Sequence, residues 1–280
     1  MTPQQNTDLQ QDLVGPMQLD AAALLGDGRV NMVIGYQRRG ERRVPALLTD
    51  ARAVDVLTFD SQCLQNLAAY LHKEEVRQKF PVAVVASPAT MRSLVLLASE
   101  SQLPDDAIVV LALDETRYLG DFDLEATAKL LNESYPNLAP PAETIKRVAE
   151  LAALSPQERA AFWTRHFERC TRCYACRAAC PSCYCKQCIV EKNTPQWISS
   201  AAREHGNYAW QVIRAFHSAG RCTACGACER ACPQGIPLML LNVKVSQDVV
   251  DQFNAKPGYD LQAKPVIGSW TPDDKQEFIR

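Results

Sequence analysis

Short apolar runs alternate with amphipathic segments through the first half of the chain. The runs with the pattern of strands, rich in β-branched residues and bounded by turn residues, are 30–37, 44–49, 82–87 and 107–113. The segments whose apolar residues recur at helical spacing are 62–79, 89–101 and 124–134. Strands and helices in this order predict an α/β domain that ends near Pro140.

In the second half the apolar spacing becomes helical. Residues 142–154 lead into a second helical segment, which starts with Ser155 as the N-cap, a proline at the first helical position and Glu158 in the first turn. We expect this helix to deliver Cys170 to a site. A further helix is expected within 197–220, where a glycine ends it.

Composition and charge argue against a nucleic-acid-binding, membrane-spanning or secreted protein. The 280 residues carry a formal net charge of -2 and a pI near 6.1, so no global electrostatic attraction to nucleic acid or an anionic membrane is expected. No apolar run approaches the roughly eighteen residues of a membrane span. The N-terminus has neither the basic start nor the apolar run of a signal peptide. These features predict a cytoplasmic protein with no nucleic-acid partner and no transmembrane segment.

The twelve cysteines are concentrated in one stretch, since eleven lie between Cys170 and Cys232. Eight of them form two copies of the spacing C-x2-C-x2-C-x3-C-P. The first copy is Cys170, Cys173, Cys176 and Cys180, and the second is Cys222, Cys225, Cys228 and Cys232. Paired runs of this spacing are typical of proteins with two 4Fe-4S clusters, in which the fourth cysteine of each run binds the other cluster.

Crossed ligation has a physical reason. One short turn of backbone brings three thiolates to three corners of a cube but cannot also reach the fourth corner. The predicted ligands are Cys170, Cys173, Cys176 and Cys232 for cluster 1, and Cys222, Cys225, Cys228 and Cys180 for cluster 2. A disulfide scaffold needs an oxidising compartment, and zinc sites usually pair two C-x2-4-C clips, so both alternatives fit this spacing poorly.

Four cysteines remain after the eight are assigned: Cys63, Cys183, Cys185 and Cys188. Four is the number that one more 4Fe-4S cluster needs, and three of them crowd the stretch "CPSCYCKQC". Three interpretations stay open: a third cluster on all four, an open or alternative site without Cys63, or unligated structural thiols. A lone cysteine at a helix start, such as Cys63, is more often a small buried apolar residue.

Basic side chains surround the first motif. From Arg159 to Lys192 the chain has seven basic residues and two acidic ones. A 4Fe-4S cube with four thiolates carries about two negative charges or more, so nearby cations make its reduction less unfavourable.

Three segments carry a resemblance to a known family: "CPSCYCKQC", "RAFHSAGRCTACGACERACPQGIPL", and "VIGYQRRGERRVPALLTDARAVDVLTFDSQCLQNLAAYL". Together they resemble the iron-sulfur beta subunits of deazaflavin-linked hydrogenases and formate dehydrogenases, and bacterial relatives found with heterodisulfide-reductase-like complexes. The resemblance covers residues 20–255. It implies a relay subunit between a flavin or deazaflavin site and a catalytic partner.

The chain also departs from that family. It lacks family cysteines in "ASPATMRS" and "ALDETRY", and its dicluster module follows the α/β domain instead of preceding it. The segment "LGDGRVN" lacks the third glycine of a dinucleotide-binding loop. These differences argue against bound FAD.

The expected fold class is an α/β N-terminal domain followed by an α-helical dicluster ferredoxin-like domain. The helical form is favoured because 41 residues separate Cys180 from Cys222, more than in a compact bacterial ferredoxin. The expected parts are a flexible N-terminal tail (1–18), an α/β domain of beta-subunit type (19–140), a helical 4Fe-4S dicluster domain (141–245) and an extended C-terminal tail (246–280).

The function predicted from these features is that of an electron-transfer subunit of a cytoplasmic multi-subunit oxidoreductase. It would relay electrons through two 4Fe-4S clusters, or three, between a redox partner and a catalytic subunit such as a formate dehydrogenase, a hydrogenase or a heterodisulfide-reductase-like protein. Two alternatives are a flavin-binding subunit that performs hydride transfer itself and a redox-sensing regulatory protein. No catalytic residue is assigned.

Overall fold

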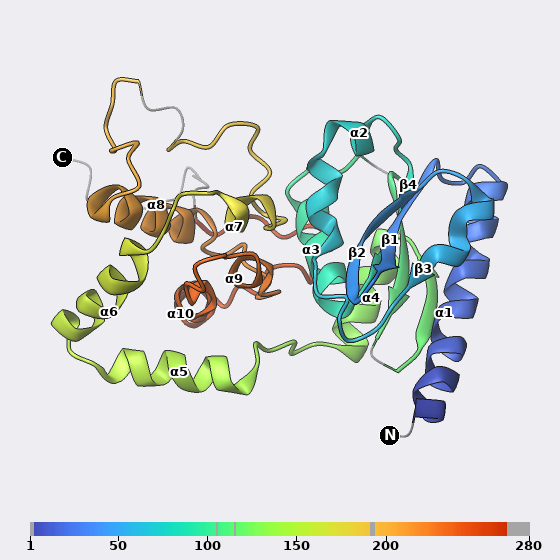
Figure 1. Ribbon diagram of the computed structural model, residues 1–280, viewed down its shortest axis with the longest axis horizontal. Coiled ribbons are helices and arrows are strands. Elements are labelled where there is room, and N and C mark those ends of the chain that lie inside the picture. Colours follow the sequence, from blue (N-terminus) through green and yellow to red (C-terminus); the bar gives the residue numbers. More distant parts are fainter. Residues whose placement is uncertain (1–2, 105, 115, 191–193, 268–280) are drawn as a thin grey trace.

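Two lobes lie side by side in the computed structural model, which describes residues 3–104, 106–114, 116–190 and 194–267 (Figure 1). The α/β lobe contains the sheet and helices α1 to α4, and the helical lobe contains α5 to α10. Buried apolar side chains form two separate clusters, one in each lobe. The predicted order, an α/β region followed by a helical region, is therefore confirmed.

A mixed sheet forms the centre of the α/β lobe. Its strands are β1 (Met32–Arg39), β2 (Arg42–Leu48), β3 (Leu57–Thr58), β4 (Val82–Ala86), β5 (Ile108–Leu113) and β6 (Tyr118–Phe122). The order is β2-β1-β4-β5-β6, with β3 also paired to β1. Strands β1, β4 and β5 are parallel, whereas β2 and β6 pair antiparallel with their neighbours. Antiparallel strands thus flank a parallel centre.

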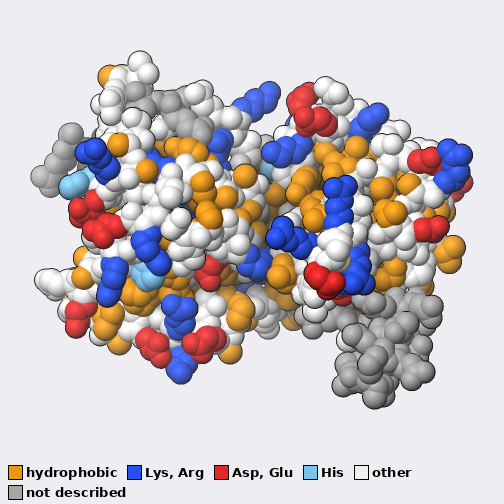
Figure 2. Space-filling model, viewed as in Figure 1, with side chains coloured by type: hydrophobic (Ala, Val, Ile, Leu, Met, Phe, Trp, Pro, Cys, Tyr) orange, Lys and Arg blue, Asp and Glu red, His pale blue; other side chains and the backbone are white. Residues whose placement is uncertain are grey.

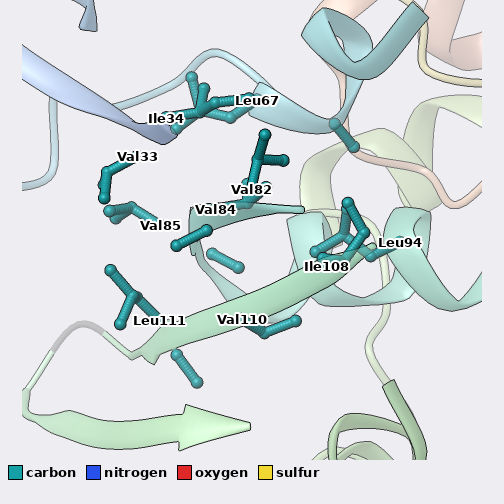
Figure 3. Packing of buried hydrophobic residues seen from close by; sticks show 14 of the residues in the cluster. Val33, Ile34, Leu67, Val82, Val84, Val85, Leu94, Ile108, Val110 and Leu111 are labelled. Carbon is teal, nitrogen blue, oxygen red and sulfur yellow. The ribbon is translucent and has the colours of Figure 1, made fainter. Parts of the chain in front are cut away.

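The core of this lobe follows from the continuous apolar runs of the central strands. Every residue of β4 is buried, as expected for a strand covered on both faces. Figure 3 shows Ile108 beside Leu94 of helix α3 (Pro88–Ser99). Ser87 caps α3 by accepting a hydrogen bond from the Thr90 amide, and Pro88 occupies the first turn. The sequence signals for this strand and helix are therefore both present in the structure.

The segment 62–79, predicted as one helix, is instead a short 3-10 helix, η2 (Leu67–His72), followed by α2 (Glu74–Arg77). The Asn66 side chain accepts from the Ala68 amide and so starts η2, and Lys73 is extended between the two turns. The remaining elements of this lobe are η1 (Ala51–Val56) and α4 (Leu124–Ser134).

The N-terminal segment differs from the expected flexible tail of residues 1–18. Helix α1 spans Pro3–Gly26. Its side chains Leu13, Met17, Ala21 and Leu24 recur at helical spacing and are at most 6% exposed, within the apolar cluster of the α/β lobe. The polar start of the segment hid this stripe, and Gly15 and Pro16, which both disfavour a helix interior, interrupt it.

The helical lobe is built from α5 (Ala142–Ala153), α6 (Pro156–Glu168), α7 (Ala175–Ala178), α8 (Glu204–His217), α9 (Ala227–Arg230) and α10 (Leu238–Phe253). The capping box predicted at the start of α6 is present, with the Ser155 amide donating to Glu158 and the Glu158 amide donating to Ser155. Helix α6 packs against α8, and α10 packs against α5 and α8. Within the described ranges, no helix combines the length and apolar character needed to cross a bilayer.

The C-terminal segment also differs from the expected extended tail of residues 246–280, because α10 continues to Phe253. Beyond the helix the chain returns to the α/β lobe. The Tyr259 hydroxyl donates to the Tyr135 carbonyl, and the Arg92 guanidinium lies 4.8 Å from the centre of the Tyr259 ring. Residues 268–280 of the predicted tail lie outside the described residues.

Candidate metal centre

The two cysteine motifs follow the same backbone path. In each, a four-residue helix, α7 or α9, lies between the second and fourth cysteines. Left-handed residues recur at the same two offsets, with Arg172 (φ 54) matched by Ala224 (φ 55) and Tyr174 (φ 59) matched by Gly226 (φ 74). Such alternation turns successive backbone N–H groups toward one point, a concave arrangement that binds anions and occurs at iron-sulfur sites.

The structure brings the eight paired cysteines together in two sets of four, each around a small cavity. Site 1 is lined by Cys170, Cys173, Cys176 and Cys232, and site 2 by Cys180, Cys222, Cys225 and Cys228. Each site takes three cysteines from one motif and the fourth from the other. Helices α7 and α9 are in contact, which allows this exchange.

Site 1 lies at the end of α6, next to the point where α8 packs against α6. The Asn207 side chain donates to the backbone carbonyls of Phe167 and Cys170, at 3.0 and 2.7 Å, and so fixes the chain that follows α6. Gln211 Nε2 lies 3.4 Å from Cys170 Sγ. Cys170 and Cys176 are buried, whereas Cys173 is exposed. Site 1 therefore has one side that reaches the surface.

Site 2 is more enclosed, and its thiols are difficult to ionise without a cationic partner. Burial raises the pKa of Cys222 to about 11 and that of Cys228 to about 12. Asn242 Nδ2 lies 3.4 Å from Cys228 Sγ. Hydrogen bonding from the neighbouring Cys183 thiol instead lowers the pKa of Cys180 to about 6. Since iron binds thiolates, loading this site must release protons, and it becomes more favourable as pH rises.

The donor set at each site is four cysteine thiols, the set that binds a 4Fe-4S cluster. Among the described residues, no three Cys, His, Asp or Glu side chains converge closely enough to hold one ion. The cysteines of each site instead surround a space, which is the arrangement that iron atoms at separate corners of a cube need. The residues present therefore fit a cluster.

Hydrogen bonds and an ion pair connect the second cysteine motif to the α/β lobe. Arg230 Nη2 donates to the Leu64 carbonyl at 2.5 Å and to the Cys225 carbonyl at 2.8 Å. Arg221 forms a two-pronged ion pair with Glu100, the residue that follows α3, at 2.5 and 2.7 Å. The sheet lobe therefore holds the second motif in place.

A cavity of about 780 Å³ lies between the lobes, against helices α7 and α9. Its lining includes four basic side chains, Arg42, Arg43, Lys73 and Arg230, together with Tyr70 and Glu41. On the face shown in Figure 2, basic side chains gather where the two lobes meet. The volume of this cavity is typical of small-molecule binding sites, which often lie between domains.

The four remaining cysteines are distributed differently. Cys63 belongs to the α/β lobe, where its sulfur accepts from the Asp60 amide at 3.4 Å and burial raises its pKa to about 12. Cys183 lies against Cys180, and Cys185 is exposed. Cys188 packs at the edge of the apolar cluster of the helical lobe. The third cluster therefore stays a prediction.

Replacing Cys63 tests whether it is a ligand of a third cluster. Because this thiol is surrounded by groups of its own lobe, we expect Cys63→Ser to leave the iron content of anaerobically purified protein unchanged. Iron per chain, measured by elemental analysis, is the readout. A loss of about four irons relative to the parent protein would instead make Cys63 a ligand of a further cluster.

The residues missed by the sequence analysis lie on α8 and α10: Asn207, Gln211, Arg214 and Asn242. Their exposed fractions are 5% or less. Asn207, Gln211 and Arg214 recur at helical spacing, but this signal alone does not identify them, because polar residues at that spacing also form solvent-exposed faces.

Comparison with known proteins identifies a 4Fe-4S domain in the part of the chain that contains both cysteine motifs. Residues 166–236 match the 4Fe-4S dicluster domain family. The beta subunit of an F420-dependent formate dehydrogenase from Methanocaldococcus jannaschii is 34% identical over 106 residues, which is 38% of this chain and 27% of that protein. The beta subunit of F420-dependent formate dehydrogenase 1 from Methanococcus maripaludis is 31% identical over 110 residues, 39% of this chain and 28% of that protein.

The matched region thus spans little more than a quarter of the length of these relatives. The domain match covers both cysteine motifs, and both relatives are named as beta subunits. The predicted resemblance is confirmed: residues 166–236 match a 4Fe-4S dicluster domain, and part of this chain is similar to the beta subunits of F420-dependent formate dehydrogenases.

Proposed function

We propose that this chain is an electron-transfer subunit of a cytoplasmic oxidoreductase complex and holds one 4Fe-4S cluster at site 1 and one at site 2. The ligands would be Cys170, Cys173, Cys176 and Cys232 at site 1, and Cys180, Cys222, Cys225 and Cys228 at site 2. When bound, each cluster supplies a reversible change of oxidation state.

One observation carries the proposal: each cavity is lined by three cysteines of one motif and the fourth of the other. This exchange was expected from the spacing alone, and disulfide pairing would not require it. The division of the buried apolar side chains into two clusters supports the domain boundary near residue 140. The matching left-handed residues of the two motifs support a ferredoxin-like arrangement within the helical lobe.

The surroundings of site 1 and site 2 suggest a different electron-transfer partner for each site. Cys173 brings site 1 to the protein surface, where a partner can approach. Arg230 and Arg221 hold site 2 against the α/β lobe. We therefore assign site 1 to exchange with an external redox protein and site 2 to exchange across the boundary between the lobes. The partners would be a redox protein and a catalytic subunit of formate dehydrogenase, hydrogenase or heterodisulfide-reductase-like type.

A reductive titration tests this function. Anaerobically purified protein should take up about two electrons per chain from dithionite, with bleaching of its visible absorption, and return them to an added one-electron acceptor. The isolated chain should reduce no nicotinamide or deazaflavin by itself. Uptake that leads to no onward transfer would favour a redox-sensing role instead.

The cavity between the lobes favours a second candidate, the flavin-binding subunit. Its basic lining suits a phosphate-bearing ligand, and Ala175 and Ala227 bring the cysteine helices to its wall. Flavin released on denaturation of the purified chain would support hydride chemistry here. A denatured sample that yields only iron and sulfide would leave the relay function.

A further inference from the structure

Helix α8 carries a buried polar face that extends from site 1 to site 2. Asn207, Gln211, Arg214 and Ser218, the residue that follows α8, recur at steps of four, three and four residues, which places them on one side of the helix. All four are at most 5% exposed. Gln211 lines site 1, and Ser218 lines site 2. The polar face is therefore shared by both sites.

Arg214 lies between the two sites on this face. At about 1.5 Å per residue, Gln211 is about 4.5 Å from it along the helix axis in one direction and Ser218 about 6 Å in the other. The guanidinium interacts electrostatically with Cys176 of site 1 and with Cys180 and Cys228 of site 2. One cation thus faces thiols of both sites.

This cation is not neutralised by an acidic side chain in the described part of the chain. Arg214 is 5% exposed, and its Nε and Nη1 atoms have no hydrogen-bond partner there. The other comparably buried arginines are used differently. Arg92 donates to the carbonyls of Leu138, Thr223 and Pro257, and Arg172 donates to those of Ser199 and Ala201. Arg214 is therefore a buried charge whose Nε and Nη1 atoms lack both an acidic partner and the carbonyl partners that Arg92 and Arg172 have in the described residues.

A buried charge without a counter-charge is strongly destabilising, so its surroundings must supply negative charge. Burial alone would lower the pKa of Arg214, but its electrostatic interactions with Cys228, Cys176 and Cys180 raise that pKa above its usual range, and the group stays charged. A cluster with four thiolates carries about two negative charges, and clusters bound at sites 1 and 2 would place such a charge on each side of Arg214.

We propose that Arg214 is a shared counter-charge of sites 1 and 2, a positioning residue whose unpartnered N–H groups face cluster sulfur and which makes reduction of both clusters easier. The inference rests on the proposed function, since it requires clusters at both sites. Reduction adds negative charge to a cluster, and the fixed guanidinium stabilises that charge in a poorly solvated environment.

The test is a redox titration of anaerobically purified full-length protein, monitored by electron paramagnetic resonance. Arg214→Gln should make reduction of both clusters about tenfold less favourable, equivalent to about 59 mV per one-electron step, with iron content unchanged. Arg214→Lys keeps the charge and should restore most of the parent potentials. A role in packing alone would not separate the two variants in this way.

Unchanged potentials in Arg214→Gln, or a shift of one cluster only, would overturn the inference. If Arg214→Gln does not assemble its clusters, the Arg214→Lys variant is the test. Potentials like those of the parent protein in Arg214→Lys would support the shared counter-charge. Failure of Arg214→Lys to assemble clusters would reject it, because the site would then require the shape of the guanidinium and not its charge. A parent protein without clusters gives no resonance at all, so failure of the proposed function is distinguishable from failure of this inference.

Discussion

Cys232→Ser is expected to remove the cluster at site 1, although Cys232 belongs to the second motif. Site 1 is lined by Cys170, Cys173, Cys176 and Cys232, so the substitution leaves three thiolates from the first motif without their fourth partner. Iron per chain should fall from about eight to about four. Anaerobic alkylation followed by peptide mass spectrometry should then modify the three remaining cysteines of site 1 and leave those of site 2 protected.

Cys180→Ser is the matched control for this experiment. It removes the first-motif cysteine that lines site 2, and it should expose Cys222, Cys225 and Cys228 to alkylation while site 1 stays protected. The two variants therefore predict opposite labelling patterns. If each variant exposed the cysteines of its own motif, the crossed assignment would be wrong.

Removal of iron is expected to unfold the helical lobe selectively. Sites 1 and 2 lie among its helices, and α7 and α9 have only four residues each, too few for an isolated helix to be stable. Because ligation contributes folding free energy, an iron chelator under reducing conditions should raise amide exchange at least about tenfold across α7 to α9. The strands of the α/β lobe should keep their protection.

The reason for this difference is the size of the two apolar clusters. The sheet lobe buries a large set of side chains that includes all of β4 and four residues of α3. The helical lobe has a smaller set that itself includes Cys170, Cys176 and Cys228. Hydrogen exchange with mass spectrometry resolves the lobes, and reconstitution with iron and sulfide is the control. Equal loss of protection in both lobes would show that the sheet also depends on iron.

Sequence patterns correctly predicted the helices and strands whose ends are set by residues within or next to the element itself. The segment 124–134 coincides with α4, because Asp123 accepts from the Ala126 amide and sets the start of the helix. The segment 62–79 failed because Asn66 and Lys73 impose turns that helical spacing does not reveal. Helix α1 was missed because its apolar stripe becomes visible only against the sheet that it covers. Local turns thus decided the first of these two cases, and tertiary packing decided the second.

The candidate site follows the same pattern. Cysteine spacing was sufficient to predict the two sets of four, since offsets along the chain determine which thiols one turn can present. It could not predict Gln211, Arg214 or Asn242. Polar residues at helical spacing have the pattern of a solvent-exposed face, and only the packing of α8 and α10 shows that these three are buried beside the sites.

The most direct test of the account is the amount of iron and acid-labile sulfide in anaerobically purified protein. We predict about eight of each per chain, from two four-iron clusters, with little zinc. A folded, colourless protein that contains zinc or no metal would contradict the central claim, because the two sets of cysteines would then hold nothing that carries an electron.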